Sequence, residues 1–183
     1  MEITQREFAG LLHGIVFGAL YLLAFTGGLA GLYSLRPQLL TAEGVTERLR
    51  RMRLGMVLMA VLVWLTVIVG TYVVYPDYRA APPTTVDTTI QSDELEQYPR
   101  YWLLASDDTA DWHRFAMEWK EHVAWIAPML ATVVAFAVLR YGDALVENTR
   151  ARYIIMVLFF LSFAIAGIAG LLGALITKVA PIT

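Results

Sequence analysis

Four long apolar runs alternate with polar segments along the chain. They extend from about Phe8 to Leu35, Leu54 to Tyr75, Glu121 to Leu139 and Tyr153 to Thr177. About 20 helical residues cross the hydrocarbon core of a bilayer, and each run approaches or exceeds that length. Backbone groups in lipid must be satisfied within their own segment, which favours helices over open strands. The pattern predicts an all-α membrane protein: four transmembrane helices in an up-down-up-down bundle, forming one domain over residues 1–183.

Prolines and a glycine punctuate these runs. Proline removes a backbone donor and clashes with the preceding turn, so it commonly stops a helix. We therefore expect the first helix to end before Pro37 and the second to end at Pro76. Gly142 is the expected end of the third helix.

Charge predicts the orientation of the bundle. The connections 36–53 and 140–152 hold eight arginines and four acidic residues, a net charge of +4, whereas the termini and segment 76–120 carry −6. Short loops rich in Lys and Arg stay in the cytoplasm. We expect a multi-pass protein of the cytoplasmic (inner) membrane, with both termini and segment 76–120 extracytoplasmic.

Segment 76–120 is too long to be a passive connector in a compact bundle. Its first half is rich in Pro, Thr and Asp and is expected to be extended. Its second half is aromatic and partly amphipathic, and Asp107 or Asp108 could cap a helix that runs on through Trp112 into the third span. We expect a short amphipathic helix that caps the outer mouth of the bundle.

Composition supports a membrane location and limits the chemistry. The chain is 58% hydrophobic and 16% charged, and it has no cysteine. Soluble domains are typically about 45–50% apolar and about 25% charged, so the lipid bilayer is an expected partner. The absence of cysteine excludes disulfides, thiolate metal sites, iron–sulfur clusters and covalently attached haem. A net charge of −2 gives no reason to expect nucleic acid binding.

Two histidines are the leading candidates for chemistry. His13 and His122 lie near the outer ends of the first and third runs. Ionisable groups are rare in spans and usually functional, and imidazole is the commonest metal ligand. Helices one and three of an up-down-up-down bundle lie diagonally across its core. We expect the two imidazoles to be the axial ligands of one haem b, although their depths differ by four residues, or roughly 6 Å.

Residues beside these histidines suggest how such a group could be held. Gly10, Gly14 and Gly18 leave a strip without side chains next to His13. The strip could seat a flat ring against the helix, or it could serve helix–helix packing, which is common in membranes. Glu118 precedes His122 by one helical turn and could hydrogen-bond to it, which would orient the imidazole.

His113 is a rival second ligand. It lies in the polar stretch Asp-Trp-His-Arg, where an exposed role or contact with a haem propionate is more natural. The basic side chains near the outer mouth of the bundle could form charge-assisted hydrogen bonds to the haem propionates. These basic residues are Arg79, Arg100, Arg114 and Lys120.

Three function hypotheses follow. The first is a b-type haem protein that relays single electrons between membrane quinol and an external or neighbouring redox subunit. Such a chain would be an electron-transfer subunit of a respiratory or photosynthetic complex rather than a stand-alone enzyme. The second is a cofactor-free structural or assembly subunit of a larger membrane complex. The third is a non-haem metal-binding membrane protein that uses His113, Glu118, Glu121 and His122.

The architecture resembles small membrane cytochromes b in having four helices with histidines on two of them. This is a likeness of fold, and function has to be argued from the site.

Transport is disfavoured because ion and proton relays generally need a charge near the middle of a span. Here the polar side chains well inside the spans are Thr66, Thr132 and Ser162.

Overall fold

Four helices dominate the structure, and each is long and apolar enough to cross a membrane. They cover Glu7–Tyr33, Glu43–Tyr78, Asp107–Glu147 and Thr149–Val179. The computed structural model describes residues 5–36 and 41–181, and no strand occurs among them. The prediction of an all-helical membrane protein with four candidate spans is confirmed at this level.

Several of these long helices are made of shorter pieces. The first comprises α1 (Gln5–Leu11), the π-helical η1 (Leu12–Ala19) and α2 (Leu20–Tyr33). The second comprises α3 (Ala42–Val69), the π-helical η3 (Gly70–Val74) and α4 (Tyr75–Tyr78). After α5 (Pro99–Leu104), the third comprises α6 (Asp107–Glu121), the 3₁₀ turn η4 (Val123–Trp125) and α7 (Ile126–Glu147), and the fourth is α8 (Thr149–Val179).

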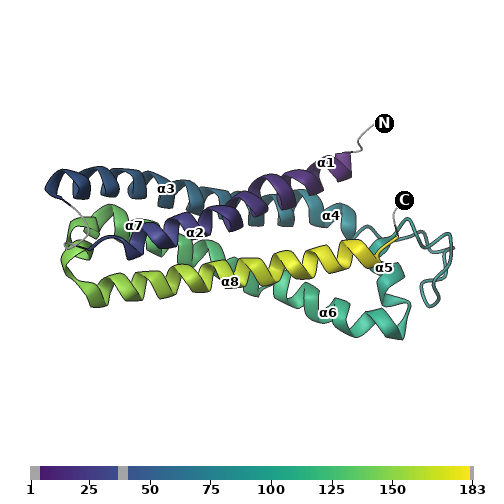
Figure 1. The fold of residues 1–183 in the computed structure, drawn as a ribbon. Coiled ribbons are helices and arrows are strands. Elements are labelled where there is room, and N and C mark those ends of the chain that lie inside the picture. Colours follow the sequence, from purple (N-terminus) through teal and green to yellow (C-terminus); the bar gives the residue numbers. More distant parts are fainter. Residues whose placement is uncertain (1–4, 37–40, 182–183) are drawn as a thin grey trace.

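The four helices lie side by side along one long axis (Figure 1). Close contacts join α2 to α3, α3 to α7, α7 to α8 and α8 back to α2, so each helix has two principal neighbours. The segments α1, α4, α5 and the end of α8 lie at one end of the molecule. The end of α2, the start of α3 and the link from α7 to α8 lie at the other end (Figure 1).

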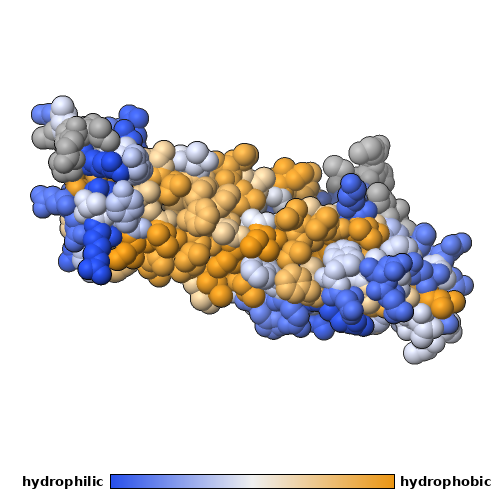
Figure 2. Space-filling view, turned by 60° about the horizontal axis from the view of Figure 1, so that its bottom comes forward, coloured by the Kyte–Doolittle hydropathy of each residue, from blue (hydrophilic) through white to orange (hydrophobic). Residues whose placement is uncertain are grey.

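Apolar side chains cover the middle of the molecule. Figure 2 shows a broad hydrophobic band flanked by hydrophilic ends. Leu23, with 77% of its surface exposed, and Ile15, with 66%, point outward from the first helix. An apolar surface of this extent is unfavourable in water and suits a helix bundle surrounded by lipid.

Local sequence sets several helix ends. The Thr41 side chain accepts a hydrogen bond from the Gly44 amide at 3.2 Å, which caps α3. The Asn148 side chain accepts one from the Ala151 amide at 2.9 Å, which caps α8. Such caps satisfy amides that lack a partner inside the helix.

The first helix ends at Tyr33, before Pro37 as expected, although Pro37 itself lies outside the described residues. The other two predicted helix ends were wrong. Pro76 lies in the first turn of α4, where proline is tolerated, and the helix continues to Tyr78. The third helix bends at Tyr141 (φ −123°, ψ 18°) and continues to Glu147. Gly142 serves packing instead, because a Cβ there would lie 3.1 Å from Leu49 Cδ2 on α3.

Polar side chains inside the spans bond from one helix to the next. Ser162 on α8 donates to the Ala127 carbonyl on α7 at 2.7 Å. Its single proton is thereby used, so the Tyr21 hydroxyl on α2, 2.6 Å away, must donate to Ser162 Oγ. Hydrogen bonds of this kind join helices where no water is present.

We predict that Ser162→Ala lowers the free energy of unfolding by about 1–3 kcal/mol, because it strands the buried Tyr21 hydroxyl. Thermal unfolding of the purified protein in detergent micelles measures the effect. The double variant Tyr21→Phe/Ser162→Ala removes both hydroxyls and should recover part of the loss. A single variant as stable as the wild type would contradict the assignment.

Candidate functional site

His13 lies in the π-helical segment η1 and is held by the second helix. Its Nδ1 is 2.7 Å from the Thr66 carbonyl oxygen on α3. A carbonyl can only accept a hydrogen bond, so Nδ1 must carry the proton. In the neutral ring Nε2 then has a free lone pair, the arrangement typical of a histidine that ligates through Nε2.

Gly70 makes room for this ring. A Cβ at position 70 would lie 2.5 Å from His13 Cε1 and 2.8 Å from His13 Nδ1. Gly70 also begins the π-helical segment η3, so both helices change from α to π geometry in the segments that meet around His13. Single π turns are rare and are frequently found at functional sites.

Lys120 on α6 points toward the same region. A Cβ at Gly173 on α8 would lie 2.6 Å from Lys120 Nζ, so the glycine leaves space for the ammonium group. Lys120 is also close enough to His13 to interact with it electrostatically. The amine makes no ion pair with a carboxylate within residues 5–36 and 41–181.

His122 occupies a different position. It terminates α6, its side chain is 68% exposed, and its Nδ1 is 3.2 Å from Glu118 Oε2, as the one-turn spacing predicts. Residues two apart on a helix project about 200° apart, so an inward Lys120 directs His122 outward. In the described part of the chain, no hydrogen bond or ion pair joins His122 to His13.

The three glycines of the predicted strip, Gly10, Gly14 and Gly18, lie in two different environments. A Cβ at Gly18 would lie 3.1 Å from the His13 carbonyl oxygen and 3.6 Å from Thr66 Cγ2, so Gly18 is a packing position. A Cβ at Gly10 or at Gly14 would meet nothing within 4 Å. Among the described residues, none packs against these two glycines.

A second cluster of polar residues lines a pocket of about 290 Å³ between α4, α5 and α6. We call it the outer pocket. Arg79 and Arg114 both line it, whereas Lys120 is not among its lining residues. The lining residues are Tyr75, Arg79, Arg100, Leu104, His113, Arg114, Met117, Glu118 and Glu121.

His113 is buried in the wall of the outer pocket, with 2% of its surface exposed. The expectation of an exposed His113 was therefore wrong. Its Nε2 is 2.6 Å from the Tyr78 hydroxyl, which occupies the nitrogen that a ligand to iron would use. Its Nδ1 is buried without a hydrogen-bond partner among the described residues.

Two tyrosines that hold α4 against α6 were not predicted from the sequence. The Tyr75 hydroxyl donates to Glu121, and Tyr78 bonds to His113, so α4 is tied to α6 twice. Tyrosines at the end of a span are typical of an aromatic belt at the membrane interface, so their position alone does not indicate these contacts. Tyr75 and Tyr78 are three residues apart and share a helix face, which could have suggested partners on a second helix.

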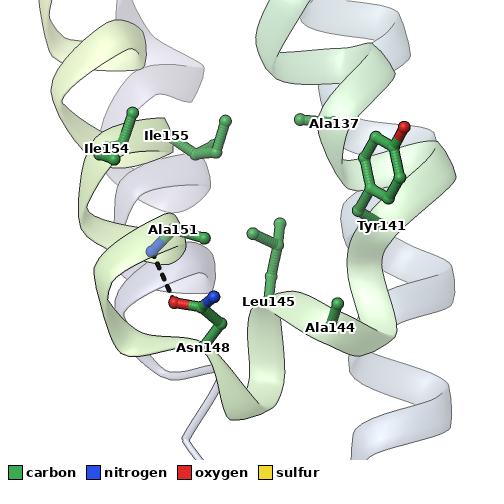
Figure 3. Close-up of a pocket in the computed structure, with 8 residues that line it drawn as sticks. All are labelled: Ala137, Tyr141, Ala144, Leu145, Asn148, Ala151, Ile154 and Ile155. Atoms are coloured by element: carbon green, nitrogen blue, oxygen red, sulfur yellow. Dashed lines mark hydrogen bonds between the residues drawn. The ribbon is translucent and has the colours of Figure 1, made fainter.

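A third feature is an apolar groove of about 320 Å³ between α7 and α8, near their connection (Figure 3). None of its lining residues carries a charge, and its one marked hydrogen bond is the Asn148 cap. The groove has no donor set for a polar cofactor. Its lining residues are Ala137, Tyr141, Ala144, Leu145, Asn148, Ala151, Ile154 and Ile155.

The described residues contain no cluster of three or more His, Cys, Asp or Glu side chains arranged to hold a metal ion. The group His113, Glu118, Glu121 and His122 therefore does not form such a centre in this structure.

No known family model, curated protein or solved structure matches this chain.

We predict that Gly70→Ala lowers the free energy of unfolding by about 1–3 kcal/mol, because the added methyl group overlaps the His13 ring. Thermal unfolding in micelles measures this change. Gly55→Ala on the same helix is the matched control, since a Cβ there meets nothing within 4 Å. It should be neutral or stabilising by up to about 1 kcal/mol. Equal effects of the two substitutions would contradict the close packing of His13 on Gly70.

Proposed function

We propose that this chain is a membrane b-type haem protein that relays single electrons between membrane quinol and an external or neighbouring redox subunit. The observation that carries the proposal is the orientation of His13. Its Nδ1–H is fixed on the Thr66 carbonyl, which leaves Nε2 available as a ligand atom.

The residues around His13 fit a flat cofactor. Gly10 and Gly14, one turn apart on the same helix, have open space where their side chains would be. A porphyrin needs this kind of bare helix surface beside its ligand. Lys120, which points into the bundle near His13, would supply a positive charge close to a bound anionic group.

His122 is the proposed second ligand. Its Nδ1 contacts Glu118, so its Nε2 is also free, whereas His113 has its Nε2 occupied by Tyr78. This pattern favours His122 over His113. His13 is packed between helices, whereas the side chain of His122 is exposed.

The membrane arrangement in this proposal is an up-down-up-down bundle in the cytoplasmic membrane, with segment 76–120 and both termini outside. The charge difference between the two sets of connections supports it. Haem iron with two axial imidazoles supplies one-electron transfer rather than oxygen binding. The chain would hold and orient the cofactor through His13 and exclude water with its apolar helices.

A cofactor-free subunit of a larger membrane complex is a second candidate, and a specific observation favours it. The bare surface at Gly10 and Gly14 could also receive a helix of another subunit, since small residues allow close helix approach in membranes. The exposed His122 would then face that partner or the lipid headgroups.

We predict that the protein purified from membranes shows sharp α and Soret bands after reduction with dithionite. His13→Ala should lose these bands, because it removes the anchored ligand, and His122→Ala should lose or shift them. His113→Ala is the matched control and should retain them. Added imidazole should restore part of the spectrum in His13→Ala by filling the vacated position.

A colourless wild-type protein that copurifies with other membrane subunits would favour the second candidate. Bands that survive in His13→Ala but disappear in His113→Ala would overturn the ligand assignment.

A further inference from the structure

The outer pocket carries a net positive formal charge. Three guanidinium groups and two carboxylates line it, which gives a formal charge of +1. Both carboxylates already have partners: Glu118 contacts His122, and Glu121 accepts a hydrogen bond from Tyr75. The two carboxylates offset two of the three positive charges, which leaves the formal charge of +1.

Two of the three arginines lack a counter-ion. Arg114 pairs with Asp111 at 2.8 Å, on an exposed part of α6. The side chains of Arg79 and Arg100 make no ion pair or hydrogen bond with any residue in the described ranges 5–36 and 41–181. Their guanidinium carbons lie 5.1 Å and 5.6 Å from the ring centroids of Tyr75 and Tyr101. These rings help to position the guanidinium groups, whose N–H donors have no acceptor among the described residues.

His113 adds a buried group without a partner. Its ring lines the pocket, only 2% of its surface is exposed, and Nδ1 has no hydrogen-bond partner among the described residues. If Tyr78 donates to Nε2, then Nδ1 carries a proton and is a further donor. A buried polar atom left unpaired destabilises a protein, so a ligand oxygen here would be favourable.

We propose that the outer pocket binds a phosphate group. Guanidinium groups match phosphate oxygens in charge and geometry, and a singly charged phosphate suits the formal charge of the pocket. A volume of about 290 Å³ suits a small group. The pocket lies where the second candidate span ends at Tyr78, so both a lipid headgroup and a dissolved phosphate can reach it. This proposal does not depend on haem.

Thermal unfolding of the full-length protein in dodecyl maltoside tests the proposal. Inorganic phosphate at ten times its dissociation constant should raise Tm by roughly 3–6 °C above sodium chloride of equal ionic strength. Arg79→Gln/Arg100→Gln should abolish this rise. Arg140→Gln/Arg150→Gln is the matched control, because both residues are exposed at the other end of the molecule and Arg140 also lies over a tyrosine. It should keep the full response.

A second experiment distinguishes the two sources of phosphate. If short-chain dihexanoylphosphatidylglycerol stabilises the protein at lower concentrations than inorganic phosphate does, the ligand is a lipid headgroup. Equal or weaker stabilisation by the lipid identifies free phosphate. If the double variant folds poorly, Arg79→Lys keeps the charge but loses the two-pronged geometry and should reduce the response several-fold. A rise no larger than that from chloride, or one lost equally in the control variant, overturns the proposal.

Discussion

The interior of a bilayer holds no water, so every polar group in a membrane span needs a partner within the protein. This constraint organises the whole bundle. His13 bonds to Thr66 between the first and second helices, and Trp64 bonds to Thr132 between the second and third. Ser162 joins the third and fourth helices through the Ala127 carbonyl and the fourth to the first through Tyr21. At least one polar contact thus accompanies apolar packing at each of the four neighbouring helix pairs.

The same constraint explains why His13 differs from the other polar groups in the spans. Ser162 uses its hydroxyl both as donor and as acceptor, so it has little capacity left for a ligand. An imidazole bonded only through Nδ1 keeps a second nitrogen free, and Gly70 lets that ring approach the second helix closely. The arrangement both links two helices and leaves a ligand atom, which is why His13 carries the functional proposal while Tyr21 and Ser162 are explained by structure alone.

The coarse fold could be predicted from the sequence, because hydrophobic length and helical backbone satisfaction are local properties. The third helix begins at Asp107 and runs through η4 into α7, as the sequence indicated, but the expected cap was wrong, because Ser106 rather than Asp107 or Asp108 is the N-cap residue. The candidate site around His13 depends on which side chains face the interior of the bundle. The spacing of residues along one helix does not determine this. Lys120 and His122 are two residues apart, and only the packing of α6 on α8 determines that the lysine faces inward. The burial of His113 depends on a tyrosine 35 residues away in sequence.

The most direct test of the account concerns the proton on His13. Nitrogen-15 NMR of the protein labelled selectively in histidine, with the His13 signals identified by comparison with His13→Gln, reports which ring nitrogen is protonated. The account predicts a proton on Nδ1 and none on Nε2. A proton on Nε2, with Nδ1 bare or also protonated, would contradict it, since Nε2 would then have no lone pair to offer a metal.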